Sequence, residues 1–351
     1  MEFNEGLLML QEINRLHPLL LVGTGLSVSM GIPGMAKLAD WLSDRVPKRL
    51  TDSPELLHEW CESEHAIHAH GLEQGLAERP VSGSLLEIIV DETYFLIDNH
   101  DQALRRKLAQ SQSSAEFPFA DLLRHLFRSL SPNQPTLDVV TPNYDLIVEY
   151  ACDLIGAECV TGFVGTHIQT FHPDVLMQDR YVLPPLPRSM PQKISRIRLL
   201  KPHGSLHWWQ KAERTIQFRD GPELGGYSHA MITPGTTKYL RSMTQLVLNH
   251  HRELANERMR RANAFIIFGY GFNDDHLQTV LFDRMRQVPG VIVTHQLSEK
   301  ARGFVERCPR TLALEAAPGN DKFTRWHYDN AVGVWEIPAW ELNTYVKYVI
   351  G

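Results

Sequence analysis

The chain has few cysteines and no long apolar run. Its four cysteines form no Cys-x-x-Cys pair and no dense pattern, and they are Cys61, Cys152, Cys159 and Cys308. This spacing argues against a disulfide framework and against a zinc ribbon, so we expect reduced thiols and no metal. The longest apolar stretches, residues 19–22 and 264–268, are far shorter than the roughly 20 residues of a membrane-spanning helix.

A basic excess is also missing. The 351 residues include 41 acidic and 35 basic side chains, which gives a formal net charge of −6. Because no global positive field draws the chain to phosphate backbones or anionic membranes, we expect neither direct nucleic-acid binding nor membrane binding. The first 17 residues lack the basic start and apolar run of a secretory signal, so we expect a cytoplasmic protein.

Strand-like and helical segments alternate in most of the chain. An apolar run at 18–22 leads into a glycine-rich turn and a helical segment at 35–42, and further strand-like runs lie at 136–141, 196–200, 264–268, 290–294 and 311–314. The proline-rich stretch 165–195 is expected to be a loop without regular structure. The alternation predicts an α/β fold, a doubly wound Rossmann-like parallel sheet, formed by residues 1–46 and 131–351.

Residues 47–130 have a different pattern. Their apolar residues follow helical spacing, most clearly in a stripe on one helix face that consists of Phe119, Leu122, Leu123, Leu126, Phe127 and Leu130. Apolar residues that recur every three or four positions are typical of an amphipathic helix. We predict an inserted helical subdomain over 47–130.

The glycine-rich turn after the first strand indicates a dinucleotide site. It reads Gly23-Thr24-Gly25-Leu26-Ser27 and is followed by Gly31-Ile32-Pro33. Glycines at this place let backbone amides approach a pyrophosphate and direct a helix amino terminus at its charge. The dehydrogenase fingerprint would need glycine at Val28, and a bare Gly-x-Gly is also common in tight turns.

Two further segments place polar side chains after strands. Asn143 and Asp145 follow the run at 136–141, where open α/β sheets bind their ligands, although an Asn-x-Asp helix cap is the alternative. His203 follows the run at 196–200 and precedes Gly204. Histidine suits proton exchange at neutral pH, and the alternative is a hydrogen-bonded core histidine.

Four segments, in this order, resemble the motifs of the sirtuins, the silent information regulator family. They are G-x-G-x-S-x-x-x-G-I-P from Gly23, Thr141-Pro142-Asn143-Tyr144-Asp145, Lys201-Pro202-His203-Gly204-Ser205, and Phe268-Gly269-Tyr270-Gly271-Phe272-Asn273-Asp274. The resemblance covers about residues 15–45 and 135–300 and implies NAD⁺ as substrate. Asn143 and Asp145 would lie by the nicotinamide and its ribose, with His203 as general base. The cofactor-binding residues would be Gly23, Thr24, Gly25, Ser27, Ile32, Pro33, Gly269, Tyr270, Asn273 and Asp274. For Asp274, a helix amino-terminal charge is an equal alternative.

The resemblance implies cleavage of the nicotinamide-ribose bond to nicotinamide and ADP-ribose. Deacylase sirtuins carry two Cys-x-x-Cys pairs after the histidine, whereas this chain has only Cys308 there. The insert at 47–130, the Asn-Tyr-Asp version of the second motif and the Gly-Tyr-Gly-Phe-Asn-Asp turn look more like bacterial sirtuin-like proteins of antiphage defence, which deplete NAD⁺. Protein deacylation and a non-enzymatic sensor of NAD⁺ or ADP-ribose stay open as alternatives.

The same resemblance implies partners. In that group the NAD⁺-cleaving domain is joined to a sensor or encoded beside one, such as a HerA-type ATPase. The chain ends soon after the nucleotide domain, so we expect a homo-oligomer that works with a separate subunit. The insert and the tail around Trp335 and Trp340 are candidate contact surfaces, although core packing is the favoured interpretation for both tryptophans.

Overall fold

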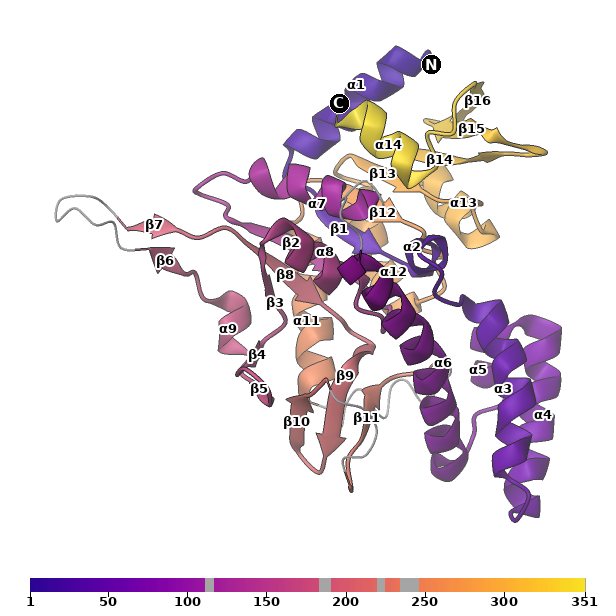
Figure 1. Cartoon of the computed structure of the whole chain (residues 1–351). Coiled ribbons are helices and arrows are strands. Elements are labelled where there is room, and N and C mark those ends of the chain that lie inside the picture. Colours follow the sequence, from indigo (N-terminus) through magenta and orange to yellow (C-terminus); the bar gives the residue numbers. More distant parts are fainter. Residues whose placement is uncertain (111–116, 183–190, 220–224, 234–245, 351) are drawn as a thin grey trace.

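The fold is built on one nine-stranded sheet (Figure 1). The computed structural model describes residues 1–110, 117–182, 191–219, 225–233 and 246–350. The strands run in the order β16-β15-β14-β13-β12-β1-β2-β8-β3, and those from β14 to β3 pair in parallel. Their bounds are β1 Leu19–Val22, β2 Thr136–Val140, β3 Glu158–Val160, β8 Arg196–Leu200, β12 Phe265–Phe268, β13 Gly290–Val293 and β14 Thr311–Ala317. β15 (Asn320–Tyr328) and β16 (Ala331–Trp335) extend the sheet as antiparallel strands.

Alternating side chains of the central strands pack into two separate hydrophobic cores. Leu20 and Val22 of β1 belong to one apolar cluster, and Leu19 and Leu21 belong to another. Because neighbouring residues of a strand point to opposite faces, both faces of the sheet are covered. This explains the uninterrupted apolar runs of the sequence, and it confirms the predicted α/β fold with a largely parallel sheet.

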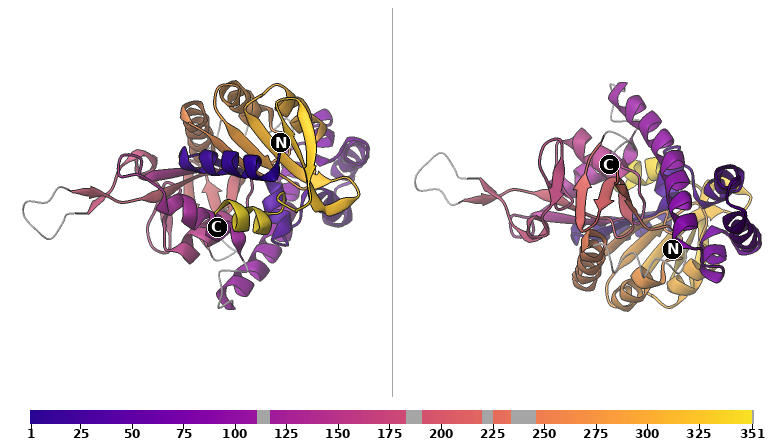
Figure 2. Two further views of the ribbon diagram at one scale, coloured as in Figure 1. Left: turned by 90° about the horizontal axis from the view of Figure 1, so that it is seen from above. Right: turned by 90° about the horizontal axis from the view of Figure 1, so that it is seen from below.

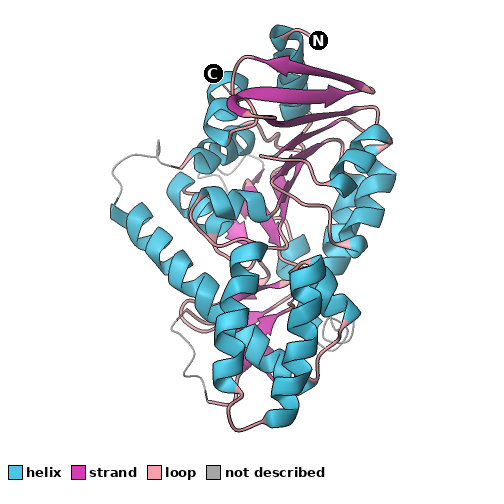
Figure 3. Cartoon of the chain, turned by 90° about the vertical axis from the view of Figure 1, so that its right-hand side faces the viewer, coloured by secondary structure: helices cyan, strands magenta, loops and turns pink. Residues whose placement is uncertain are grey.

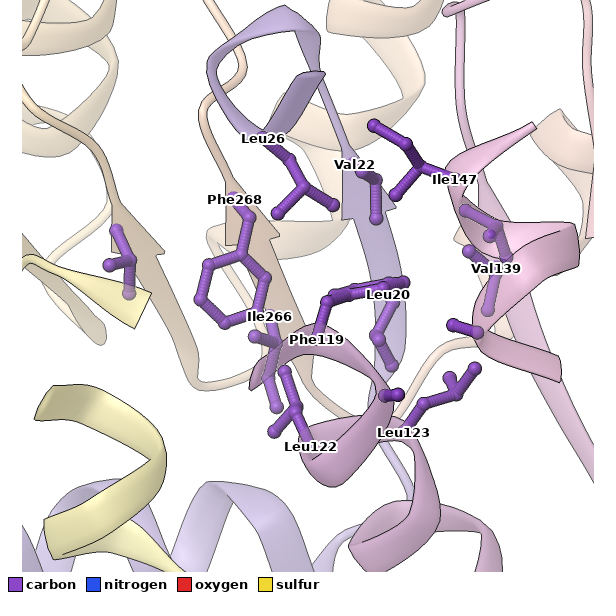
Figure 4. Packing of buried hydrophobic residues seen from close by; sticks show 14 of the residues in the cluster. Leu20, Val22, Leu26, Phe119, Leu122, Leu123, Val139, Ile147, Ile266 and Phe268 are labelled. Atoms are coloured by element: carbon purple, nitrogen blue, oxygen red, sulfur yellow. The ribbon is translucent and has the colours of Figure 1, made fainter. Parts of the chain in front are cut away.

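Helices cover both faces. One face carries α1 (Phe3–Arg15), α7 (Pro118–Arg128), α8 (Ile147–Ile155) and α14 (Leu342–Val349). The other carries α11 (Leu246–Arg261), α12 (Asp275–Met285) and α13 (Glu299–Glu306). Figure 4 shows Phe119, Leu122 and Leu123 of α7 directed at the strands. The apolar stripe read from the sequence therefore packs on the sheet.

A group of four helices has a core of its own. It comprises α3 (Met35–Arg49), α4 (Pro54–His70), α5 (Leu72–Glu78) and α6 (Gly83–Gln110), which lie together in Figure 3. Trp60 is fully buried in their shared cluster. The second half of α6 joins the core on the sheet instead, through Tyr94, Ile97 and Leu104. We call α3–α6 the helical unit.

A second sheet has the order β11-β9-β10-β5-β4 and contains β4 (Phe163–Val164), β5 (Gln169–Phe171), β9 (Gly204–Lys211), β10 (Arg214–Gln217) and β11 (Ser228–Met231). The short helix α9 (Asp174–Met177) leads to a two-stranded hairpin of β6 (Tyr181–Val182) and β7 (Gln192–Lys193), which projects from the body (Figure 2). The prediction of a loop without regular structure over 165–195 is therefore wrong for β5, α9, β6 and β7, while residues 183–190 lie outside the described residues. The prolines gather at 184–191, and the flanking segments pair across them.

Trp335 is a core residue, with 4% of its surface exposed. Its ring packs on Phe3 at 5.3 Å, and its Nε1 donates to the carbonyl oxygen of Met1. Core packing, the alternative favoured from the sequence, therefore holds for Trp335, because α1 covers its ring. Trp340 is half-buried, and its Nε1 donates to the carbonyl of Asp321. Within the described ranges, no helix is long and apolar enough to cross a membrane.

Candidate functional site

A cavity of about 350 Å³ lies where the carboxyl ends of β1, β2, β8 and β12 meet. Open α/β sheets bind ligands at this edge. The cavity brings together twelve of the thirteen residues predicted from the sequence: Thr24, Gly25, Ser27, Ile32, Pro33, Asn143, Asp145, His203, Gly269, Tyr270, Asn273 and Asp274. Gly23, the thirteenth, is not in the lining.

The glycines of the two turns pack against each other. A Cβ on Gly25 would lie 2.6 Å from the Cα of Gly269, and one on Gly23 would lie 2.5 Å from the Gly269 carbonyl oxygen. The amides of Gly23 and Gly25 donate to the carbonyls of Phe268 and Gly269 at 2.8 Å. The Gly-x-Gly spacing therefore serves the close approach of two turns, and these two amides have their partners within the protein.

A hydrogen-bonded chain links the first and second motifs. Asn143 donates from Nδ2 to Ser27 Oγ at 2.8 Å, and Ser27 donates to Asp145 Oδ2 at 2.6 Å. Ser27 comes from α2 (Thr24–Ser29), and only 2% of its surface is exposed. Since Nδ2 is held, the carbonyl oxygen of the Asn143 amide is the atom oriented to accept a bond from a ligand.

The two carboxylate oxygens of Asp145 have different partners, one at the start of α8 and one in the cavity. Its Oδ1 accepts from the backbone amide of Ile147 at 3.2 Å, at the start of α8. Its other oxygen accepts from Ser27 inside the cavity. Asp145 therefore bonds the first amide of α8 and also lies in the cavity, although the N-cap residue of α8 is Leu146.

His203 pairs with Asp274 across the cavity. Its Nε2 lies 2.6 Å from Asp274 Oδ2, and the two side chains are 15% and 7% exposed. Asp274 directly precedes α12, and its carbonyl accepts from Gln278 within that helix. The carboxylate faces the imidazole from the helix amino terminus, so it determines which ring nitrogen carries the proton.

Lys201 donates hydrogen bonds that stabilise the loop carrying Asn143. This lysine is fully buried, and its Nζ donates to the carbonyl of Asp145 at 2.5 Å and to Glu149 Oε1 at 3.0 Å. Burial raises the pKa of Glu149, which Lys201 opposes. Lys201 belongs to the same motif as His203, so one strand end both holds the Asn143 loop and carries the imidazole.

Asp101 supports the same loop from α6. Its Oδ1 accepts from the amide of Leu146 at 2.9 Å, and its Oδ2 accepts from the hydroxyl of Tyr150. Burial raises the pKa of Asp101 to about 7, against the effect of these two hydrogen bonds. Asp101, a titratable residue of the helical unit, is thus hydrogen-bonded to the backbone at the start of α8.

The helical unit also contributes to the cavity wall. Leu38 of α3, Glu73 of α5 and Ile97 of α6 line it, together with Met35 at the start of α3. Analysis of the sequence missed these residues, because they lie in no motif and their apolar spacing is that of ordinary helices. Among the described residues, no group of three or more His, Cys, Asp or Glu side chains could hold a metal ion.

Comparison with known proteins finds one family model and several solved structures that are similar to this chain. A family model described as a SIR2-like domain matches residues 138–310. No curated protein matches the chain. Similar solved structures include one described as a structural basis for the mechanism and regulation of Sir2 enzymes, with 11% identity, a TM-score of 0.41 and 97% of each chain covered. An ADP-ribose complex of a Sir2 homologue variant has 12% identity and a TM-score of 0.45, and covers 100% of this chain and 97% of that chain. With a SIR2-like domain over nearly half of its length, the protein is sirtuin-like.

Proposed function

We propose that the protein hydrolyses NAD⁺ at the bond between nicotinamide and ribose, and releases nicotinamide and ADP-ribose. The SIR2-like domain supports an NAD-dependent activity in general. The observation that carries the finer proposal is the convergence of Asn143, His203 and both glycine-rich turns on one cavity. A site that only bound the dinucleotide would give no reason for an imidazole held by a carboxylate beside an oriented amide.

The reaction requires that the water be positioned, that the charge of the transition state be stabilised and that a base accept a proton. Nicotinamide leaves from a cationic pyridinium, so the transition state at the ribose C1′ resembles an oxocarbenium ion. The C1′–N bond breaks as nicotinamide departs neutral, and the oxygen of a water molecule bonds to C1′. The amide oxygen of Asn143 would orient that water or a ribose hydroxyl, and His203 would take the proton, with Asp274 stabilising the imidazolium.

The biological setting is proposed on the resemblance. The helical insert, the Asn-Tyr-Asp motif and the Gly-Tyr-Gly-Phe-Asn-Asp turn support a cytoplasmic enzyme of antiphage defence that depletes NAD⁺. A homo-oligomer with a separate sensor or a HerA-type ATPase subunit fits this setting. Mass measurement on a size-exclusion column that shows a lone monomer at micromolar concentration contradicts the oligomer.

The test is chromatography of NAD⁺ after incubation with wild type, Asn143→Ala and His203→Ala, alone and with the product of the neighbouring gene. We expect nicotinamide and ADP-ribose from wild type and a loss of at least about a hundredfold in each variant. Asn99→Ala and His58→Ala are matched controls, because both residues are exposed on the helical unit and neither lines the cavity. Equal activity in all five proteins would overturn the assignment of the site.

Two further measurements separate the alternatives. A peptide with an acetylated lysine distinguishes deacylation, which would release nicotinamide only when the peptide is present. Calorimetry with NAD⁺ distinguishes a sensor, which would bind the dinucleotide and leave it intact. The sequence disfavours the deacylase, since only Cys308 follows His203 and the zinc module of that class needs four cysteines.

A further inference from the structure

A second polar cavity lies at the opposite end of the same parallel strands. Its volume is about 320 Å³. The lining comes from the amino-terminal starts of β1 and β2, from β8, and from the last turn of α11, through Leu19, Thr136, Asp138, Arg198, Arg258 and Arg261. No residue is shared between this lining and that of the candidate NAD⁺ cavity. We call it the basic cavity.

The charges of the basic cavity do not balance. Four cationic side chains line it, from Arg198, Arg258, Arg261 and Lys193, against the two carboxylates of Asp138 and Asp179. Lys193 and Asp179 pair with each other at 2.6 Å. Asp138 forms ion pairs with two guanidinium groups. Its Oδ1 lies 3.0 Å from Arg198 Nη1, and its Oδ2 lies 3.1 Å from Arg258 Nε. Arg261 pairs with Glu257, which lies outside the lining, at 3.1 Å. Arg198 and Arg258 share one carboxylate, so one positive charge is uncompensated at the wall.

Arg198 is the least satisfied of these groups. It is 5% exposed, and its Nε and Nη1 have no hydrogen-bond partner. Nη1 lies near Asp138, but the contact lacks the alignment of a hydrogen bond. A buried guanidinium with open donors is costly unless an acceptor supplies the missing bonds. Burial lowers the pKa of Arg198, against the effect of Asp138, as expected for a charge that is short of anionic partners.

His17 lies on the same wall of the cavity. Its Nδ1 is buried without a hydrogen-bond partner, and its backbone φ is +52°. The residue follows Leu16, the C-cap of α1, where glycine or asparagine is the usual choice for a left-handed conformation. His17 is part of the cavity lining, and its Nδ1 is buried within the wall.

We propose that the basic cavity binds a small anion that carries a phosphate group. The guanidinium groups of Arg198 and Arg258 offer the forked donors that phosphate oxygens match. Asn133 and Gln134 line the same space and could bond a polar body attached to the phosphate. The volume is at the lower end for ligand sites, which suits inorganic phosphate or a mononucleotide.

Calorimetry of the full chain with AMP and with inorganic phosphate, at low ionic strength, tests this site. We expect saturable binding that weakens as salt is added. Arg258→Gln should weaken binding by at least about tenfold, because it leaves Asp138 and Arg198 as a balanced pair. Arg260→Gln is the matched control, because it removes the same charge from the same helix at an exposed position outside the lining, and it should keep the wild-type affinity.

The outcomes are distinct. Binding of both probes indicates that the phosphate group alone is recognised, and binding of AMP alone indicates that the attached body is recognised as well. AMP binding that is equal in wild type, Arg258→Gln and Arg260→Gln would assign the ligand to another place, such as the NAD⁺ cavity, and overturn the proposal. So would the absence of binding at millimolar concentrations. Thermal unfolding of both variants checks that they fold, and none of these results depends on NAD⁺ hydrolysis.

Discussion

Asp274 is the carboxylate that faces the imidazole of His203. The 2.6 Å contact between Asp274 Oδ2 and His203 Nε2 joins a helix start to a strand end. If the ring donates from Nε2 to this carboxylate, Nδ1 is left with the lone pair that can take a proton. An amide in place of the carboxylate could orient the ring through the opposite tautomer, and it would not stabilise the imidazolium.

Asp274→Asn should therefore lower the kcat of NAD⁺ cleavage by about a hundredfold or more, with little change in KM. Steady-state kinetics of nicotinamide release give both constants. The exposed Asp329→Asn is a control that preserves the charge change. A variant that raises KM and keeps kcat would show that Asp274 only binds the dinucleotide.

Ser27 connects Asn143 to Asp145 at distances of 2.8 and 2.6 Å. Ser27→Ala removes a partner from both side chains, so the amide of Asn143 is free to rotate. We expect nicotinamide release to fall by about tenfold or more. Ser29→Ala, on the same helix but exposed and outside the cavity lining, should retain activity. Equal rates in the two variants would mean that Ser27 does not position Asn143.

The residues of the cavity could largely be predicted, but their contacts could not. Motifs placed Asn143, His203 and Asp274 after strands, and parallel strands bring such positions to one edge. The pairing of His203 with Asp274 depends on β8 and β12 lying on opposite sides of β1 and β2, which no local pattern specifies. For the same reason Glu73 of the helical unit carries no sequence signal for its place in the wall.

Among the elements, α6 connects the helical unit to the loop of Asn143. Asp101 accepts from Leu146 and Tyr150, and it is 1% exposed. Its pKa is raised by burial from 3.8 to about 7. Between these two pH values the folded chain holds a proton that the unfolded chain has lost, so this group makes the free energy of unfolding fall as pH rises.

Asp101→Asn should remove that part of the pH dependence. Relative to wild type, the variant should gain stability by on the order of 3 kcal/mol between pH 4 and pH 7, and the difference should be constant above that window. Asparagine can keep both hydrogen bonds, as acceptor from Leu146 and donor to Tyr150. Denaturant unfolding of both proteins at several pH values measures the difference. Parallel curves would contradict the raised pKa.

Element types were easier to predict than their boundaries and partners. Continuous apolar runs such as 19–22 and 265–268 indicate strands buried on both faces, and both strands are present. β15 lacks such a run, because polar residues such as Lys322 and Arg325 interrupt it. β16 is apolar in sequence, but it exposes Val332 and Val334. The division into a nucleotide domain, 1–46 and 131–351, and an insert, 47–130, stays a prediction.

At the scale of the molecule, the two chain ends close one side of the sheet. α1 and α14 contact each other, and Trp335 of β16 packs under α1. Gly6 allows this approach, because a Cβ there would lie 2.3 Å from Cζ2 of the Trp335 ring. The ring is 4% exposed, so it has little room to move.

Gly6→Ala therefore tests whether this contact stabilises the whole fold. Alanine in a helix interior normally stabilises by roughly 0.5–1 kcal/mol, and Gly303→Ala in α13, where no atom lies within 4 Å of the new Cβ, should do so. Gly6→Ala should instead destabilise by roughly 1–3 kcal/mol through overpacking. Combining Gly6→Ala with Trp335→Phe, which removes the ring atoms that clash, should recover part of the loss. Denaturant unfolding of the four proteins gives the signs, and stabilisation by Gly6→Ala would show that the chain ends do not pack this closely.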